Sequence, residues 1–530
     1  MAEEICDFNL LDSLSQNETR AKELEMKGIE TKSDEQIIAG LDALTKQGQR
    51  QQVLKELSRI LKTSASRSLR PALARIANRN HAYVLALRIL HPIIREDREK
   101  IAEAGADTLN IYATSLMWIG ALEEAQDCLR RIKGFTDALL TEAFVHFAKW
   151  DYLKSMPLLE KYLASPKTSP YQKLVAQINL LAAQIAVGNL TAAKSLFEVL
   201  SGELRANPST KLLYGNSLEL RSQIEILENS YDTALKYLAE SEMQLADQPG
   251  RYLLYVNKWR ALAQLGLAPK DGAAHEALSK VKSEAMELKN WETIRDCDFH
   301  LARMTGNQDL LQRILLGTPY QGYRDRIESL FGITLDKKHP EARTLEYCPG
   351  NANSKPERIG LDLGRLSDHA FLSSTSWPLI QVMTKDIYRP PRMGVIFSEL
   401  YKDEHFNPFT SPQRVRNSIF RFNDWAQETG CEFRIRVSNG DFQFVGPRNL
   451  GVIRTQHTRS LESWQASLKI FKNQNDSRSF TTNDVAQVLR ITPRSALQIL
   501  QKALAAKKIQ KIGRGKNARY IFYSGRRAAA

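Results

Sequence analysis

Apolar residues recur at spacings of three and four along most of the first 317 residues of the chain, which is the pattern of helices with one buried face. One clear stripe is formed by Leu122, Ala125 and Leu129. Neighbouring stripes are separated by short turns, so the pattern predicts a series of helical hairpins. The turns are expected at Asn80, Gly120, Trp150, Gly188, Asn229, Gly266 and Gly306, which are 30 to 41 residues apart.

A small residue lies five positions after the turn in four of these units, at Ala125, Ser155, Ala193 and Ala234. A bulky side chain there would keep the two helices of a hairpin apart. The pattern resembles tetratricopeptide-type repeats, whose period is about 34 residues, over residues 70–317. The resemblance implies a helical solenoid that binds a protein or peptide partner, or that serves as a scaffold or dimerisation arm. Residues 1–69 are also expected to be helical.

The periodicity changes after a helix expected near residues 324–331, and residues 318–355 form a connector rich in proline, glycine and asparagine. From residue 356 to 448, two alternating segments are followed by three helical segments and a pair of strands. The last two strands are predicted to form a hairpin, because Phe433, Ile435 and Val437 alternate before a turn at Asn439 and Gly440.

This order of elements resembles the OmpR-type winged-helix domain of bacterial response regulators. In that family the third helix has an apolar skeleton, which Val415, Ile419 and Phe422 match, and the wing has a glycine followed by an aromatic residue, here Gly440 and Phe442. The resemblance implies that residues 412–428 form a helix that enters the major groove of DNA. Acidic residues lie close by, so a protein-binding role for this domain is the alternative. The residues expected to face the DNA are Arg414, Asn417, Ser418 and Arg421.

Residues 455–525 predict a second module of a similar kind. An amphipathic helix is followed by two helices that begin with threonine caps, the second with Pro493 at its first position, and then by a pair of strands. The order resembles winged-helix repressors of the MarR-like type, and Lys507 stands where those proteins commonly have a glycine after the third helix. The resemblance implies a second DNA-binding domain, in which the third helix contacts base edges and the wing contacts phosphates or the minor groove.

The net charge of +14 is concentrated in this second module. Residues 451–530 contain 16 basic and 3 acidic side chains, whereas the first 350 residues contain 45 and 46. A strongly basic domain indicates a polyanionic partner, and double-stranded DNA is the partner we expect. The expected contacts are Arg494, Ser495, Gln498, Gln501 and Lys502 on the third helix, with Lys511, Arg514, Lys516 and Arg519 on the wing.

The sequence contains no catalytic or metal-binding pattern. Its five cysteines are far apart, and the HExxH, GxSxG and P-loop motifs are absent. The chain is therefore expected not to be an enzyme and to need no cofactor or metal. An acidic N-terminus and the lack of an apolar run of membrane-spanning length indicate a cytoplasmic protein without contact to a membrane. Because no receiver domain precedes the first winged helix, phosphorelay control is not expected.

These features together predict a mostly α-helical chain, in which a tetratricopeptide-like solenoid is followed by two small α+β winged-helix domains. The expected function is that of a bacterial DNA-binding transcriptional regulator, whose helical repeats bind a protein or peptide partner or mediate self-association, for example as a homodimer. One alternative is a scaffold or adaptor subunit that resembles the PCI family, which also joins a helical solenoid to a winged helix. The other alternative is an RNA-binding protein.

Overall fold

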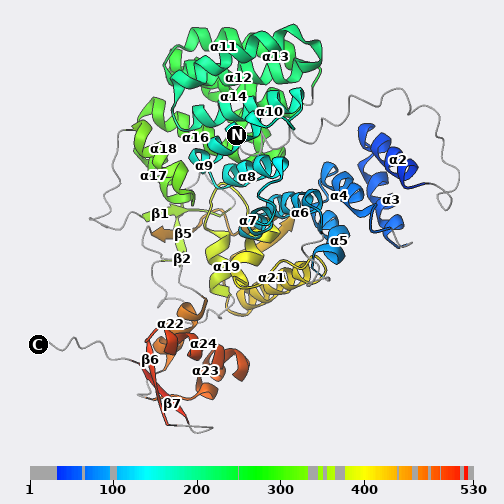
Figure 1. Cartoon of the computed structure of the whole chain (residues 1–530). Helices are drawn as coiled ribbons and strands as arrows, with labels where there is room; N and C mark the ends of the chain where they lie inside the picture. Colours follow the sequence, from blue (N-terminus) through cyan, green and yellow to red (C-terminus); the bar gives the residue numbers. More distant parts are fainter. Residues whose placement is uncertain are drawn as a thin grey trace, which may run out of the picture. The chain divides into compact units, whose positions relative to one another are not determined.

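The computed structural model describes residues 33–62, 66–95, 104–248, 250–331, 344–349, 355–363, 376–438, 441–455, 463–475, 479–489, 491–513 and 518–522. The chain divides into two compact units. Unit 1 comprises Met1–Leu335 together with His405–Thr410, and unit 2 comprises Asp336–Glu404 with Ser411–Ala530. The described residues are mostly helical, as the sequence predicted (Figure 1).

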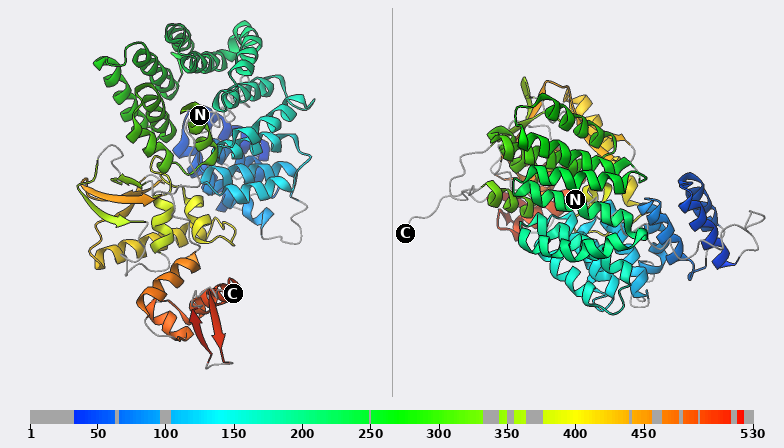
Figure 2. Two further views of the ribbon diagram at one scale, coloured as in Figure 1. Left: turned by 90° about the vertical axis from the view of Figure 1, so that its left-hand side faces the viewer. Right: turned by 90° about the horizontal axis from the view of Figure 1, so that it is seen from above.

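Unit 1 is a succession of helices in which, from α2 to α17, each helix packs against the next along the chain. In the right view of Figure 2, its cyan and green helices lie side by side. The pair α2 (Asp34–Lys46) and α3 (Arg50–Lys62) comes first, and α18 (Gln321–Phe331) comes last. Between them, the described residues form the hairpins α4 (Arg70–Arg79) with α5 (Tyr83–Ile94), α6 (Ala106–Ile119) with α7 (Leu122–Arg130), α8 (Thr136–Ala148) with α9 (Tyr152–Ala164), α10 (Pro170–Ala186) with α11 (Leu190–Ala206), α12 (Lys211–Leu227) with α13 (Tyr231–Leu245), α14 (Gly250–Leu267) with α15 (Gly272–Glu287), and α16 (Trp291–Thr305) with α17 (Gln308–Gly317).

Most of the turns inside these hairpins contain one residue in the left-handed backbone conformation, which ends the first helix. Gly120, Gly188 and Gly306 adopt it as expected, since glycine does so without steric cost. Trp150 and Asn229 also have positive φ, of 57° and 63°, although both carry side chains. Five of the predicted turns are thereby confirmed.

The turn predicted at Asn80 is present, because α4 ends at Arg79 and Asn80 lies in the turn that follows. The positive φ, of 56°, belongs to the next residue, His81. The turn assigned to Gly266 is wrong, because this residue lies within α14. A Cβ atom at Gly266 would overlap the ring of Tyr231, so the glycine there permits close packing of α14 against α13.

The small residues that follow the turns are buried, as expected. Ala125, Ser155, Ala193 and Ala234 all have a side chain with no exposed surface. Each lies at the start of the second helix of its hairpin, where the two helices of the pair approach one another.

The last helices of unit 1 contact turns that lie much earlier in the chain. The rings of Tyr323 in α18 and Trp150 in the α8–α9 turn meet edge to face, with centroids 4.4 Å apart. Gly322 approaches the backbone of Trp150 so closely that a Cβ atom would overlap the carbonyl oxygen. Arg303 in α16 donates a hydrogen bond to the backbone oxygen of Leu227 at the end of α12, at 2.8 Å. Unit 1 is therefore held together by contacts between distant hairpins as well as between neighbours.

A buried cluster of charged side chains links α14, α16 and α18. Lys258 donates a hydrogen bond of 3.0 Å to the carboxylate of Asp296, and Arg326 lies 3.9 Å from the same carboxylate. Burial opposes the charge on Asp296, but the neighbouring Lys258, His300 and Arg326 outweigh it and hold the pKa of this carboxyl below its usual range. Burial lowers the pKa of His300 to about 3, so its imidazole is neutral at pH 7.

Unit 2 begins with a three-stranded sheet of order β1-β5-β2, formed by β1 (Thr344–Tyr347), β5 (Leu450–Thr455) and β2 (Arg358–Asp362). Strand β5 is antiparallel to β1 and parallel to β2. The sheet thus takes strands from both sides of the predicted domain at residues 356–448. Strand β2 is the first of the two predicted alternating segments, and the second lies outside the described residues. Three helices and a hairpin lie between β2 and β5, namely α19 (Ser376–Met383), α20 (Met393–Leu400), α21 (Ser411–Glu428), β3 (Arg434–Ser438) and β4 (Asp441–Val445).

The remainder of unit 2 has the predicted order of three helices and a hairpin. Trp464, Leu468 and Phe471 of the first helix are buried, as the apolar stripe predicted. Both expected caps are present, because Thr481 accepts a hydrogen bond from Asp484 N and Thr492 from Ser495 N. The elements are α22 (Ser463–Gln474), α23 (Thr482–Val488), α24 (Pro493–Ala505), β6 (Ile509–Ile512) and β7 (Arg519–Phe522).

Candidate nucleic-acid interface

Helix α24 presents the polar face that the sequence predicted. Its apolar stripe, Ala496, Leu500 and Ala503, is fully buried. On the opposite side, Arg494, Gln498, Gln501 and Lys502 are exposed. The helix therefore presents guanidinium, amide and ammonium groups on the face opposite its buried residues.

Two residues of α24 differ from the expectation. Ser495 is only half exposed, and its hydroxyl lies 2.9 Å from the hydroxyl of Thr492 in the helix cap. Leu497 is 40% exposed and lies between Arg494 and Gln498 in sequence. The sequence did not single out Leu497, since leucine at a helical position is normally assigned to the buried face.

The β6–β7 hairpin adds basic side chains next to this helix in the chain. Lys511 and Arg519 are exposed, and Arg519 donates a hydrogen bond to the Ser479 hydroxyl at 3.3 Å. The backbone of Tyr520 exchanges hydrogen bonds of 3.0 and 2.7 Å with Phe480, which anchors the hairpin to the segment before α23. The wing residues Arg514 and Lys516 lie outside the described residues.

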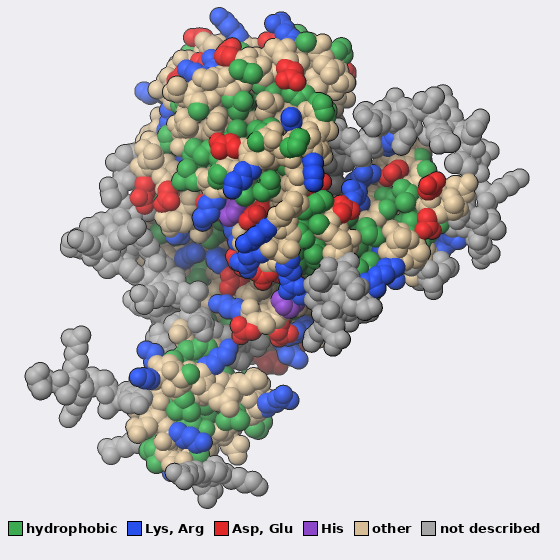
Figure 3. All heavy atoms as spheres, viewed as in Figure 1, with side chains coloured by type: hydrophobic (Ala, Val, Ile, Leu, Met, Phe, Trp, Pro, Cys, Tyr) green, Lys and Arg blue, Asp and Glu red, His purple; other side chains and the backbone are tan. Residues whose placement is uncertain are grey.

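Few acidic groups oppose this basic surface. Among the charged side chains on the visible face of this part of unit 2, at the lower left of Figure 3, blue Lys and Arg outnumber red Asp and Glu. Asp484 is engaged in the cap of α23, where its carboxylate accepts a hydrogen bond of 2.7 Å from the Thr481 amide. Lys502 lies 3.7 Å from Asp403, but both side chains are exposed, and such pairs contribute little in water.

The end of α24 is a left-handed turn at a lysine. Lys507 has a φ of 52°, and Lys508 N donates a hydrogen bond to Ala503 O at 2.9 Å, which is the bonding of a glycine-type helix end. The repressors that the sequence resembles commonly have a glycine at this position. Lys507 adopts the same type of turn, although its side chain makes this conformation sterically disfavoured.

Replacing Lys507 with glycine will therefore stabilise the module by about 1 kcal/mol. Amide hydrogen exchange in α24 is expected to slow by about fivefold, because a stabilisation of about 1 kcal/mol lowers the population of the open state by that factor. The matched control is Lys508→Gly, because Lys508 is not one of the described residues with positive φ. This substitution is expected to speed amide exchange or to leave it unchanged. Equal effects of the two substitutions would contradict the explanation.

Helix α21 of unit 2 carries the other predicted contacts. Arg414 donates hydrogen bonds of 2.5 and 2.9 Å to Glu404, and its guanidinium lies 3.9 Å from the centre of the Tyr401 ring. These hydrogen bonds lower the pKa of Glu404 and raise that of Arg414. The guanidinium of Arg414 is therefore engaged by Glu404 and Tyr401, and a phosphate would have to compete with this carboxylate for it.

The set of exposed residues on α21 differs from the predicted set. Ser418 is 4% exposed and bonds to the Tyr401 hydroxyl at 3.1 Å, so the expectation that it faces outward is wrong. The buried stripe includes Ser411 and Ser418 beside the apolar residues, which hydrophobicity alone could not indicate. The side chains that do face solvent are Gln413, Arg416, Asn417, Phe420, Arg421, Gln427 and Glu428.

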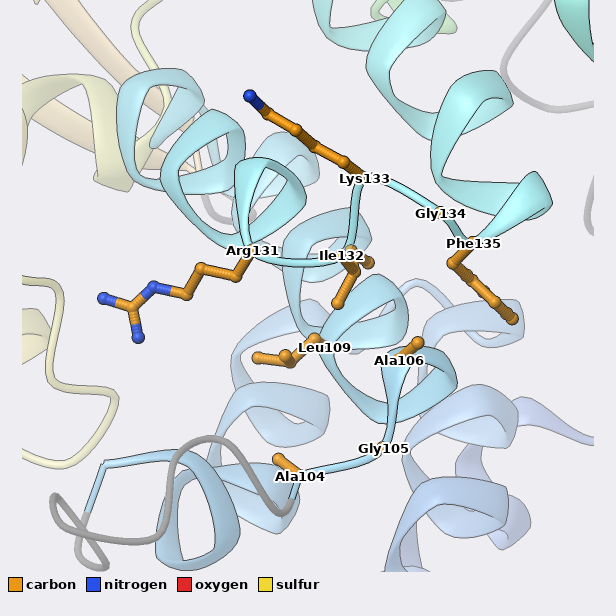
Figure 4. Close-up of a pocket in the computed structure, with 9 residues that line it drawn as sticks. All are labelled: Ala104, Gly105, Ala106, Leu109, Arg131, Ile132, Lys133, Gly134 and Phe135. Atoms are coloured by element: carbon orange, nitrogen blue, oxygen red, sulfur yellow. The ribbon is translucent and has the colours of Figure 1, made fainter.

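A cavity of about 690 Å³ lies in unit 1 at the start of α6 and the α7–α8 loop. Figure 4 shows the side chains of Arg131 and Lys133 extending away from a small apolar floor that includes Leu109 and Ile132. Among the described residues, the lining contains no acidic, histidine or cysteine side chain, so these residues offer no pair of groups for acid–base chemistry.

The described residues contain no cluster of three or more histidine, cysteine, aspartate or glutamate side chains placed to hold a metal ion. Within the same part of the chain, no helix is both long and apolar enough to cross a membrane. No protein-family model matches the chain, and no curated protein sequence is significantly similar to it.

Proposed function

We propose that this chain is a DNA-binding transcriptional regulator with two winged-helix modules in unit 2, the second of which makes most of the DNA contacts. The proposal is supported chiefly by α24, because one face of this helix exposes Arg494, Gln498 and Gln501 in a segment with very few acids. Arginine pairs with the O6 and N7 atoms of guanine, and glutamine pairs with the N6 and N7 atoms of adenine. The partly exposed Leu497 adds an apolar group suited to the methyl group of thymine.

The β6–β7 hairpin fits the role of a wing in this proposal. Lys511 and Arg519 are exposed on its two strands, and the register pairs Lys511 with Tyr520 and Ile512 with Arg519. Basic groups at such a hairpin contact phosphates and fix the orientation of the domain on the duplex, while the helix distinguishes bases.

The exposed face of α21 in the first module carries groups of two chemical kinds. Arg416, Asn417 and Arg421 suit DNA, whereas Phe420 is 67% exposed and suits a protein surface. Protein binding by this module is the second candidate function, and Phe420 is the observation that favours it.

The hairpins of unit 1 support a tetratricopeptide-like solenoid that binds a protein or peptide partner. The small buried residues after the turns allow neighbouring helices to approach closely. The near balance of basic and acidic residues in the first 350 positions makes a nucleic-acid partner for unit 1 less favourable than a protein partner.

The test is selection of bound fragments from random duplex DNA by the full chain. The wild type is expected to enrich a motif, and Arg494→Ala and Gln498→Ala are each expected to relax it at particular positions and to weaken binding by roughly 5- to 150-fold, since a good base contact contributes about 1–3 kcal/mol. Arg130→Ala is the matched control, because Arg130 is an exposed arginine of unit 1 with a side chain 65% exposed.

Three results would reject the proposal. Enrichment of no motif by the wild type favours a scaffold or adaptor subunit. Equal losses in all three variants indicate a general effect of substitution on the protein instead of base contacts by α24. Preferential binding of structured or single-stranded RNA in competition favours the RNA-binding alternative.

A further inference from the structure

A short segment from between α20 and α21 belongs to unit 1. His405–Thr410, with the sequence HFNPFT, is separated in the chain from the rest of unit 1, yet its contacts place it there. Phe406 is 1% exposed, and its backbone N–H donates a hydrogen bond of 2.8 Å to the carboxylate of Glu124 in α7. Arg88 in α5 donates a hydrogen bond of 3.0 Å from Nε to the backbone oxygen of Pro408.

The ring of Phe409 is held by the same helix. The edge of His91 lies against it with centroids 5.6 Å apart, and the guanidinium of Arg88 lies 5.9 Å from its centre. Arg88 and His91 are three positions apart in α5 and so lie on one face of the helix. One face of α5 thus contacts both a backbone oxygen and an aromatic side chain of the segment.

The acceptor on α7 is prepared for a peptide N–H group. Glu124 is only 9% exposed, and Arg95 donates a hydrogen bond of 2.7 Å to one of its carboxylate oxygens. The other oxygen accepts the Phe406 N–H. A hydrogen bond to a buried, charged acceptor is about twice as strong as one between neutral groups, so this contact favours a bound peptide backbone.

The segment is also shaped for binding by its own residues. The side-chain oxygen of Asn407 accepts hydrogen bonds from Phe409 N at 2.9 Å and from Thr410 N at 3.3 Å. Asparagine followed by proline favours such a turn, which lowers the entropy lost on binding.

We infer that the surface formed by Arg88, His91, Arg95 and Glu124, here named the Glu124 face, is a binding site for a short aromatic–Asn–Pro–aromatic peptide, and that His405–Thr410 is its resident and exchangeable ligand. Backbone hydrogen bonds supply affinity and the two rings supply specificity, as in other sites for short peptides. Phe409 is 51% exposed, so the resident segment leaves part of its own contact surface open to solvent. Covalent attachment holds the segment near the site at an effective concentration in the millimolar range, so a modest affinity suffices to keep it bound.

A partner that presents the same motif to the Glu124 face would displace the resident segment. The inference rests on the proposed function only in that unit 1 binds peptides, and it does not require DNA.

The experiment uses the full chain and a fluorescent peptide of residues 403–412. Phe406→Ala with Phe409→Ala empties the site, and this variant is expected to bind the peptide at least 10-fold more tightly than the wild type does. Adding Arg88→Ala to the emptied chain is expected to lower its affinity at least 10-fold. Arg75→Ala is the matched control in the same background, since Arg75 is an exposed arginine of α4 paired with Asp107, and it should leave peptide binding unchanged.

Hydrogen exchange of the Phe406 amide gives a second measurement that does not depend on the buried Phe406 substitution. Arg88→Ala or Phe409→Ala alone is expected to speed this exchange at least 10-fold, and Arg75→Ala is not. The inference is overturned if the emptied chain, folded by circular dichroism, binds no peptide, or if the single variants leave the exchange unchanged. Exchange that depends on protein concentration, together with a dimer in light scattering, would also overturn it by showing that the segment comes from a second copy.

These readouts separate the inference from the proposed function. Peptide binding by the emptied chain without a DNA motif from the wild type would reject the DNA-binding proposal alone. A DNA motif without peptide binding would reject the Glu124 face alone.

Discussion

Replacing Gly322 with alanine will destabilise unit 1 by roughly 3 kcal/mol, which is at the upper end of the cost of overpacking a core. Gly322 lies in α18, and a Cβ atom there would overlap the carbonyl oxygen of Trp150. The nearest atoms are all backbone atoms of Trp150 and Asp151, so no side-chain rotation can relieve the clash. Either α18 or the α8–α9 turn has to move, and the edge-to-face contact of Tyr323 with Trp150 is then lost.

Urea unfolding followed by far-ultraviolet circular dichroism measures this effect, because most helices belong to unit 1. The matched control is Gly202→Ala in α11, where an added Cβ atom meets nothing within 4 Å. Alanine favours a helix over glycine by about 1 kcal/mol, so Gly202→Ala is expected to raise the unfolding midpoint. A Gly322→Ala variant as stable as this control would show that α18 does not contact the turn as described.

DNA binding by the full chain is expected to weaken about 10³-fold between 50 and 200 mM salt. If Arg494, Lys502, Lys511, Arg514, Lys516 and Arg519 each neutralise one phosphate, the slope of log affinity against log salt is near −5, at about −0.9 per contact. The release of counterions from the duplex is the physical cause, so the slope reports how many cations meet phosphates. Fluorescence anisotropy of a labelled duplex at several salt concentrations measures it.

Variants of the β6–β7 hairpin test which residues cause the salt dependence of DNA binding. Lys511→Ala with Arg519→Ala is expected to reduce the steepness of the slope by about 2, since each substitution removes about 0.9. Arg130→Ala in unit 1 should leave the slope as it is in the wild type. A wild-type slope near zero would contradict an electrostatic interface in this module.

The sequence predicted the helices of unit 1 well because each has a strong apolar period and a local end signal. Turns at glycine or asparagine were found, as at Gly188 and Asn229. Lys289, between α15 and α16, also has positive φ and was not foreseen, because lysine carries no preference for that conformation. Gly266 was wrongly predicted to be a turn, because its small size allows packing against Tyr231 and does not end the helix.

Long-range pairing was the part of the fold that local patterns could not supply. Strand β1 pairs with β5, for example Leu345 with Arg454, across more than one hundred residues of chain. The hydrogen bond from Phe406 to Glu124 spans 282 positions. Neither contact leaves a periodic signature in the sequence, because each depends on the three-dimensional arrangement of a whole unit.

The candidate interface was predicted to different degrees on its two helices. For α24, the buried stripe consists of Ala496, Leu500 and Ala503, so the polar residues opposite, apart from the partly buried Ser495, were assigned correctly as exposed. For α21, the buried Ser418 was assigned to the exposed face. A serine that hydrogen-bonds to a neighbouring tyrosine looks like a surface residue in sequence, and only the Tyr401 contact reveals its place.

The contacts of α16 and α18 with earlier turns have a consequence for how unit 1 unfolds. An array in which each hairpin contacts only its neighbours can lose hairpins from its ends one at a time. Here the final helix is fixed to a turn 172 residues earlier, through Gly322 and Trp150, and Arg303 binds a third position between them at Leu227. The middle hairpins and the end are thereby thermodynamically linked, so the region from α8 to α18 behaves as one cooperative folding unit and resists fraying from its C-terminal side.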